Sequence, residues 1–221
     1  MKFPDRCHLT SEQSRFLVKK KWDENIYCGM RMENRAVTFP QTQTILNGVN
    51  VPNVQLDDIQ AILNMRDAWR HLLNTIDEPI TLDYLCKLNE FISRNESLEW
   101  GKLRTGTVGI SGTDYTPPIP KNGHVRNELE AIVTNGETTA TEKALESFVW
   151  GARGQFFWDG NKRTSMMLAN KILVAAGVGM LTITDKHMEH FNAFLLDYYN
   201  TGNSTELKKF LYENAIQSMT I

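Results

Sequence analysis

Apolar residues recur every three or four positions along most of the chain, the spacing that places them on one face of an α-helix. A long run of this kind lies at 56–73, and shorter runs lie at 82–92, 125–133 and 144–149. Because each such helix buries its apolar face against others, we expect an all-α, mainly helical fold.

Helix-start signals divide the chain. Thr10 with Gln13, and Thr38 with Gln41, have the spacing of a capping box, in which the first side chain and the third residue of the helix bond each other's backbone. We expect a long polar helix after the first pair and a short helix after the second. Further residues at helix-start positions are Thr81, Thr184 and Ser204.

One predicted helix differs from the others. The stretch 165–177 is apolar on nearly every face and ends at Gly177, which suits a helix C-terminus. A helix that is apolar all round is buried on all sides. We therefore expect this helix to run through the centre of the domain.

A hairpin signal interrupts the helical pattern. Short β-type runs at Val108–Ile110 and around Tyr115 are separated by Ser-Gly-Thr-Asp. The prolines at 117, 118 and 120 continue neither a ladder nor a helix. The sequence therefore predicts one exposed β-hairpin on an otherwise helical domain.

Composition narrows the class of protein. The chain has 221 residues, a net charge of -2 and three widely spaced cysteines, so we expect no nucleic-acid partner, no disulfide framework and a cytoplasmic protein. The start, MKFPDRCHLT, lacks the apolar core of a signal peptide, and no run is long enough to span a membrane. We expect a single domain over 1–221, with an N-terminal helical region at 10–50 and a core at 55–215.

The start of the central helix carries the candidate chemistry. Asp159 and Gly160 precede Asn161, Lys162 and Arg163. A helix N-terminus already carries partial positive charge and unpaired N–H groups, so two cations there are of the wrong sign unless an anion sits among them. The sequence therefore favours a phosphate site. The alternative, an ordinary cap whose cations extend into solvent, stays open at this point.

The segment Gln155-Phe156-Phe157-Trp158-Asp159-Gly160-Asn161-Lys162-Arg163 resembles the Fic motif. That motif runs His, any residue, Phe, any residue, Asp or Glu, Gly, Asn, Gly or Lys, Arg. Every specified position except the first is matched. Gly101-Lys102-Leu103-Arg104-Thr105 and the residues up to Pro117-Pro118 resemble the family's flap, and Gly29-Met30-Arg31-Met32-Glu33-Asn34 resembles its inhibitory segment. The resemblance covers about residues 28–178.

The resemblance implies a Fic-type (Fido) helical bundle that transfers AMP from ATP to a Ser, Thr or Tyr hydroxyl of a target protein. It also implies roles. Asp159 would hold Mg²⁺, and the phosphates would lie against Gly160, Asn161, Lys162 and Arg163. The motif His, the general base, corresponds to Gln155. The flap residues that would align the target by main-chain pairing are Val108, Ile110, Gly112 and Tyr115.

Gln155 is the first departure from the family pattern. An amide has no usable pKa near neutrality, so Gln155 cannot take a proton as imidazole does. It can still orient a hydroxyl or a water by hydrogen bonding. His124, just after the flap, is the nearest substitute in the sequence.

The second departure from the family pattern lies in the basic residues, at Met166 and Lys162. Many family members carry an Arg where this chain has Met166, and that Arg pairs with the inhibitory Glu. If Glu33 is inhibitory here, we expect Arg163 or Lys162 as its partner; a solvated Glu33 is the alternative. Lys162, where most members have Gly, resembles the death-on-curing toxin, a relative that transfers the terminal phosphate.

The leading hypothesis is therefore a Fic-type nucleotidyltransferase with ATP and Mg²⁺, an unidentified target protein and activity impaired or altered at Gln155. The alternatives are an inactive nucleotide-binding regulatory protein and a toxin-like phosphotransferase. A homodimer stays open, and no membrane partner is expected. His187 and His190 have a spacing that suits a metal, but no third ligand accompanies them.

Overall fold

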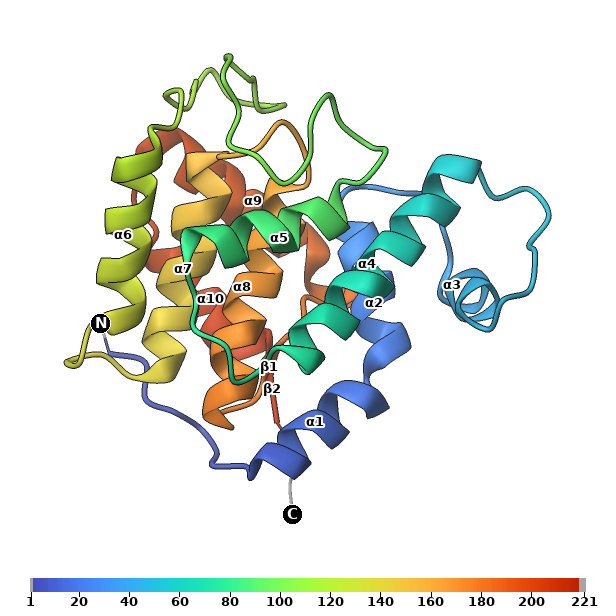
Figure 1. Ribbon diagram of the computed structural model, residues 1–221, viewed down its shortest axis with the longest axis horizontal. Coiled ribbons are helices and arrows are strands. Elements are labelled where there is room, and N and C mark those ends of the chain that lie inside the picture. The colour runs from blue at the N-terminus through green and yellow to red at the C-terminus, as the bar shows by residue number, and fades with distance from the viewer. Residues whose placement is uncertain (1, 219–221) are drawn as a thin grey trace.

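The computed structural model describes residues 2–218 and is mainly helical, which confirms the expected fold class. Figure 1 shows the helices arranged around one central helix, α8. Their bounds are α1 Ser11–Lys20, α2 Trp22–Met32, α3 Phe39–Leu46, α4 Leu56–Asn74, α5 Leu82–Ile92, α6 Asn122–Thr134, α7 Ala140–Gly154, α8 Asn161–Ala176, α9 Asp185–Thr201 and α10 Thr205–Asn214.

Helix α8 is the core of the bundle. Nearly all its side chains between Asn161 and Val174 are buried, and it packs against α7, α5, α4, α2 and α1. Gly177 ends it in the left-handed region at φ 71°, as its position in the sequence predicts. Because every neighbour packs on α8, the position of its first turn is fixed from several sides.

The helix starts follow the sequence signals closely. Thr10 with Gln13 and Thr38 with Gln41 both form complete capping boxes. Thr81 accepts a hydrogen bond from the backbone N–H of Tyr84. Thr184 and Ser204 also precede helices, but neither side chain makes a capping hydrogen bond.

The first polar helix is not continuous. At Lys21 the backbone leaves helical geometry, and the Lys21 N–H is shared between the carbonyl groups of Leu17 and Val18. No glycine or proline marks this break in the sequence. The change of direction lets α1 and α2 both pack on α8, so tertiary packing accounts for a break that periodicity does not predict.

A two-stranded sheet closes the far end of α8. Strand β1 (Met180–Leu181) pairs antiparallel with β2 (Ile216–Gln217), with Leu181 opposite Ile216. The Asn170 side chain bonds both the N–H and the carbonyl of Leu181 at 2.8 and 2.9 Å. A buried amide of α8 thereby holds the sheet against the central helix.

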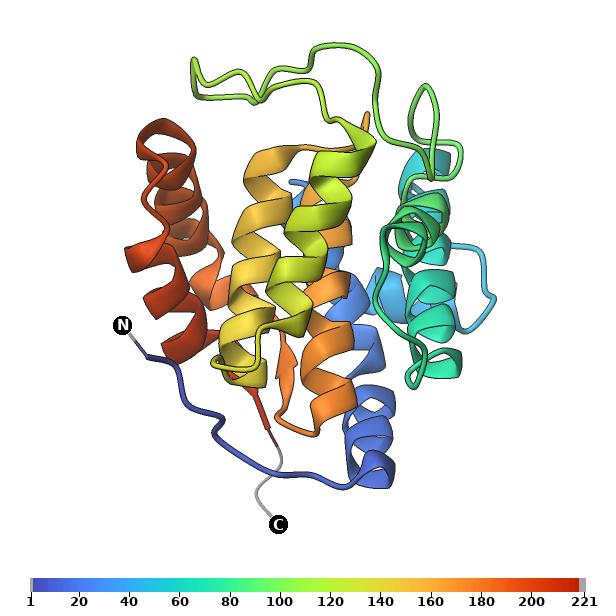
Figure 2. The ribbon, with the colours of Figure 1, turned by 60° about the vertical axis from the view of Figure 1, so that its left-hand side comes forward.

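The flap doubles back without forming a hairpin ladder. The prediction of strands at Val108–Ile110 and around Tyr115 is therefore wrong. Residues 103–121 run as a loop over the ends of α6 and α7 toward α9 (Figure 2). A two-stranded ribbon alone is marginal, and prolines on the returning limb remove backbone donors. With no third strand beside them, the two limbs stay unpaired in the described chain.

Arg104 anchors the base of this flap. Its side chain is 1% exposed and donates hydrogen bonds to the carbonyl groups of Gln155 and Gly106, each at 2.5 Å. It also donates to the carbonyls of Pro117 and Pro118, at 3.1 and 2.6 Å. One buried guanidinium thus ties both ends of the flap to the loop that follows α7.

We expect Arg104→Ala to lower the free energy of unfolding by about 3 kcal/mol or more, because buried carbonyls lose a charged donor. Urea denaturation measures this. Arg126→Ala is the matched control, since Arg126 is half-exposed and lies 3.9 Å from the exposed Asp83, and it should change stability by less than about 0.5 kcal/mol. Equal losses in the two variants would contradict the anchoring role.

Candidate active site

The candidate site lies where α7 ends and α8 begins. Gln155, the first residue after α7, and Gly160, the residue before α8, both adopt left-handed backbone conformations, at φ 46° and 71°. Such conformations are unusual for residues other than glycine. The loop 156–159 between them reverses the chain sharply, so the motif is held in one compact turn.

Gly160 is required by close packing as well as by its backbone. A Cβ at this position would collide with Ser93 Oγ and lie 2.9 Å from the Ile92 side chain. Asn89 and Ser93 of the α5 segment both donate hydrogen bonds to the Asp159 carbonyl, at 3.0 and 2.9 Å. The α5 segment therefore fixes the approach of the chain to the first turn of α8.

Asn161 and Gln155 are locked to one another and to the backbone. The Asn161 amide donates to Gln155 Oε1 at 3.1 Å and to the Phe157 carbonyl at 2.8 Å, while its oxygen accepts from the Phe157 N–H. Gln155 Nε2 donates to the Ala152 carbonyl at 2.7 Å. Both polar ends of the Gln155 amide are thus engaged within the protein.

The first turn of α8 presents open donors. Among residues 2–218, no protein acceptor is bonded to the N–H groups of Asn161, Lys162 or Arg163, and no side chain caps the helix. Asp159 is exposed, and its carboxylate accepts from the Gly160 N–H at 2.6 Å. This arrangement of N–H groups and helix dipole favours an anion.

Arg163 is buried between two carboxylates. Its Nη1 and Nη2 atoms lie 3.2 Å from the two oxygens of Glu96, and its Nε lies 3.4 Å from Glu33 Oε1 in an ion pair without hydrogen-bond geometry. Burial works to lower the pKa of Arg163, but Glu33 and Glu96 outweigh it, so the pKa is raised. Arg163 therefore remains charged, and its fork faces Glu96.

Lys162 also pairs with Glu33. Its Nζ donates to the Met32 carbonyl at 2.7 Å and lies 3.0 Å from Glu33 Oε2. Glu33 is the residue that ends α2, and its side chain is 18% exposed. The structure therefore brings Glu33 to Lys162 and Arg163, the two partners that the sequence left open, rather than into solvent.

Gly29 lies where α2 packs against both α4 and α8. Gly29, one helical turn before Glu33, faces Met65 and Met166, and a Cβ there would lie 3.0 Å from the Met65 methyl group and 3.6 Å from that of Met166. Met166 is one turn after Lys162 on α8. The two helices therefore meet in matching register, Gly29 against Met166 and Glu33 against Lys162.

Sequence reasoning missed the residues that complete this charge cluster. Arg35 lies 2.5 Å from Glu96 and 2.8 Å from Asp58, and Asn64 donates to Glu96 at 2.8 Å. Glu96 lies in the loop after α5 and its side chain is only 4% exposed. An acid in an irregular loop carries no periodic signal, so its burial follows only from the tertiary structure.

The flap contacts the bundle beside the site. The Arg153 guanidinium lies 3.8 Å from the centre of the Tyr115 ring, and Gly112 approaches Leu196 of α9. Val108 and Ile110 are half-buried on the outgoing limb of the loop. The flap is therefore held down over the end of α7 by its tip and its returning limb.

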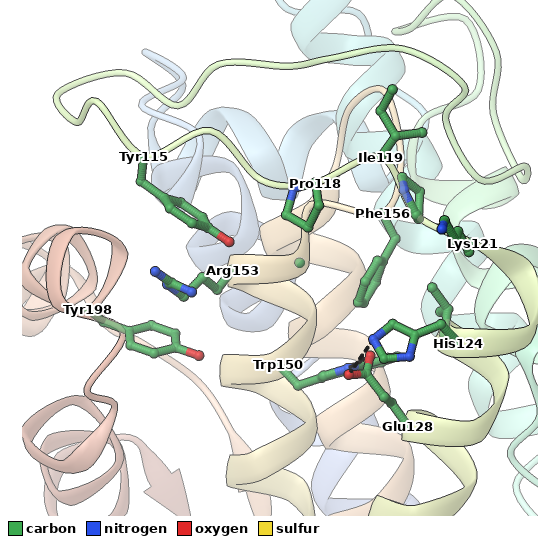
Figure 3. A pocket seen from close by; sticks show the side chains of 13 residues that line it. Tyr115, Pro118, Ile119, Lys121, His124, Glu128, Trp150, Arg153, Phe156 and Tyr198 are labelled. Atoms are coloured by element: carbon green, nitrogen blue, oxygen red, sulfur yellow. Dashed lines mark hydrogen bonds and ion pairs between the residues drawn. The ribbon is translucent and has the colours of Figure 1, made fainter.

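His124 lines a cavity whose lining includes neither Gln155 nor Asp159. Figure 3 shows it beside Glu128 and Trp150, below the returning limb of the flap. Its Nε2 lies 3.1 Å from Glu128 Oε1, and the cavity of about 580 Å³ is also lined by Phe156. The residue that the sequence offered as a substitute base is thus engaged with a carboxylate.

Residues 2–218 contain no group of three or more His, Cys, Asp or Glu side chains placed to hold a metal ion. His187 and His190 instead pack near Phe210. The exposed Asp159 suits an ion that a nucleotide carries, since Mg²⁺ is typically bound by one or two carboxylates together with phosphates.

No helix of the described chain is long and apolar enough to cross a membrane.

Comparison with known proteins finds similar sequences. Residues 79–173 match the model of the Fic/DOC family. The chain is 23% identical to a protein adenylyltransferase Fic from Nematostella vectensis over 208 residues, and 26% identical to protein adenylyltransferase fic-1 from Caenorhabditis elegans over 175 residues. These matches span 88% and 74% of this chain but only 46% and 34% of the relatives, so the chain spans less than half of their length.

Solved structures agree on the fold. A Fic-1 fragment from C. elegans superposes with a TM-score of 0.77 at 19% identity, covering 94% of this chain and 64% of that one. A Fic domain containing signaling protein from Bacteroides thetaiotaomicron gives 0.73 at 18% identity, covering 94% and 81%. Residues 79–173 are therefore similar to the Fic/DOC family, and the described chain has the fold of Fic domains, as the motif resemblance indicated.

We expect Gly160→Ala to destabilise the protein by roughly 1–3 kcal/mol, because the new methyl group meets Ser93 in a backbone conformation unfavourable to alanine. Gly136→Ala is the matched control, since a Cβ at that position meets nothing within 4 Å. The free energy of unfolding in urea measures both. A loss of less than about 0.5 kcal/mol for Gly160→Ala would show that the loop relaxes without cost.

Proposed function

We propose that the chain binds ATP at the first turn of α8 and is a protein adenylyltransferase of the Fic type whose transfer step is slowed by Gln155. The observation that carries the proposal is the joint presence of open N–H groups, a left-handed Gly160 and two cations at one helix start. The names of the relatives support the choice of AMP as the transferred group.

The nucleotide would be held by three kinds of group. Backbone N–H groups of residues 161–163 would bond phosphate oxygens, Lys162 would add a charge, and Asp159 would contact Mg²⁺. The ion, when bound, neutralises phosphate charge. Phosphoryl transfer depends mainly on such positioning and charge neutralisation, so the cradle supplies much of what the reaction requires.

The proposed active site lacks a general base at the position of Gln155. Gln155 cannot remove the proton of a target hydroxyl, and its amide is already bonded to Ala152 and Asn161. A general base contributes about 10²–10⁴ in rate, which is the impairment we expect. Gln155 therefore acts in the resting protein to hold Asn161 in place.

Glu33 is the proposed inhibitory residue. Its carboxylate lies against both Lys162 and Arg163, where a terminal phosphate would lie. Two negative groups cannot share that space, so nucleotide binding requires Glu33 to move. The charges of the cluster then remain balanced only if a phosphate replaces the carboxylate.

The target would pair with the flap. Residues 107–110 have no ladder partner in the described chain, and their backbone would pair with a target segment. Cys7, Cys28 and Cys86 are unpaired, consistent with a reducing cytoplasm as the working environment.

Two other functions have specific support. Lys162 favours transfer of the terminal phosphate, because an extra cation near the end of the phosphate chain would stabilise charge there. The engaged amide of Gln155 favours a nucleotide-binding regulatory protein without chemistry. The labelling experiment below separates all three.

We expect Glu33→Gly to bind Mg²⁺–ATP at least about 10-fold more tightly than the parent protein, a difference of about 1.4 kcal/mol, because a competing carboxylate is removed. Isothermal titration calorimetry measures the two affinities. Glu137→Gly, which removes an exposed loop acid, should match the parent. If Glu33→Gly and the parent bind equally, Glu33 does not compete with the nucleotide.

We expect the double variant Glu33→Gly/Gln155→His to label itself or an added protein with ATP labelled at the α-phosphate, about 10²–10⁴-fold faster than Glu33→Gly alone. Imidazole restores the missing base in an otherwise complete cradle. Label from the γ-phosphate instead would establish a phosphotransferase. Absence of both labels, with ATP bound, would leave the binding-only function.

A further inference from the structure

We propose that the cavity beneath the returning limb of the flap is a second ligand site, which binds a small molecule that carries an aromatic ring and a carboxylate. The cavity is separate from the start of α8, because its lining includes neither Gln155 nor any residue of 157–163. Ligand binding here is therefore independent of the nucleotide site proposed above. A fixed roof, an aromatic floor and an arginine with unbonded donors define the site.

The roof of this cavity is held in place by the chain itself. Pro118 and Ile119 cover it from the flap (Figure 3). The carbonyl groups of Pro117 and Pro118 accept hydrogen bonds from the buried guanidinium of Arg104, at 3.1 and 2.6 Å. A ligand therefore enters a space of about 580 Å³ that already has its shape, as is usual for sites that bind small molecules.

Two aromatic rings form the floor. The ring centres of Trp150 and Phe156 lie 4.4 Å apart, with an angle of 48° between the ring planes. Phe156 packs so closely on Gly154 that a Cβ there would collide with its ring. Trp150 is held by a hydrogen bond from its Nε1 to Glu128 Oε2 at 3.0 Å. Rings fixed in this way favour a third ring, packed offset or edge-on against them.

Arg153 is the cation that lines the cavity from α7. Figure 3 shows it between Tyr115 and Tyr198, and its guanidinium lies 3.8 Å from the centre of the Tyr115 ring. Nη2 donates a hydrogen bond of 3.3 Å to the Tyr199 carbonyl, whereas Nε and Nη1 have no acceptor among the described residues. Because a guanidinium fork matches the geometry of a carboxylate, these donors favour an anionic ligand.

The other polar groups also favour an anion. Among the described residues that line the cavity, Glu128 is the only acid, and its two oxygens already face His124 at 3.1 Å and Trp150 at 3.0 Å. Lys121, at the start of α6, adds a second positive charge to the lining. Burial raises the pKa of Tyr198 to about 12, so its hydroxyl stays neutral. The charges without a partner are therefore positive, and a carboxylate complements them.

The test compares 3-phenylpropionate with 3-phenylpropanol, which has the same ring and chain but no charge, by isothermal titration calorimetry. We expect the parent protein to bind the carboxylate about 10-fold or more tightly than the alcohol. Arg153→Met, which keeps the apolar stem, should weaken 3-phenylpropionate about 10-fold or more and leave 3-phenylpropanol unchanged. Arg126→Met removes a half-exposed arginine of α6 outside the cavity lining and should change neither affinity.

Glu128→Gln should act in the opposite direction. The amide oxygen still accepts a hydrogen bond from Trp150, but the negative charge is gone, so we expect 3-phenylpropionate to bind about threefold more tightly and 3-phenylpropanol to bind as before. Because the side chain of Glu128 is 39% exposed, this variant tests the site even if Arg153→Met fails to fold. Thermal melting shows which variants fold.

Any one of four results overturns the assignment. These are no binding of 3-phenylpropionate to the parent protein at about 10 mM, equal losses of the two ligands in folded Arg153→Met, no selective gain in Glu128→Gln, and displacement of 3-phenylpropionate by Mg²⁺–ATP. Displacement would place the carboxylate at the start of α8 instead. A protein that binds 3-phenylpropionate as expected but not ATP would contradict the nucleotide site alone, so the two proposals fail separately.

Discussion

The positive end of a buried helix has to be neutralised, and the arrangement around α8 follows from that requirement. Lys162 and Arg163 add two charges to a helix terminus that is already positive. The protein meets them with Glu33 from α2 and Glu96 from the loop after α5, at 3.0–3.4 Å. The anion that the sequence predicts at this helix start is thus replaced in this structure by two carboxylates of the chain itself.

The two acids are not equivalent. Glu96 lies deep, bonded to Arg35, Asn64 and Arg163, and acts as part of the core. Glu33 follows the last residue of α2, which packs on α8, and it is the more exposed of the two acids. Under the proposed function Glu96 stays in place and Glu33 moves away, so the same helix start is neutral when closed and attracts phosphate when open.

Much of the fold could be predicted from the sequence. The helices follow from periodicity, the starts of α1 and α3 from capping boxes, and the burial of α8 from its apolar faces. The flap strands could not be predicted, because strand formation depends on a partner that the two limbs do not provide. The break at Lys21 likewise reflects packing on α8 rather than any local signal.

The candidate site could be predicted only in part. The motif indicates which residues share the α8 start, and Lys162 or Arg163 were the expected partners of Glu33. The role of Glu96 could not be inferred, because a single acid in an irregular loop shows its partner only once the chain is folded. The direction of the Arg163 fork depends on Glu96, and so it too required the structure.

The most direct measurement is a crystal structure of Glu33→Gly with Mg²⁺ and a non-hydrolysable ATP analogue. The account predicts phosphate oxygens within hydrogen-bond distance of the N–H groups of residues 161–163 and of Lys162 Nζ, in the place of the Glu33 carboxylate. A nucleotide bound elsewhere, with this helix start free of phosphate, would contradict it.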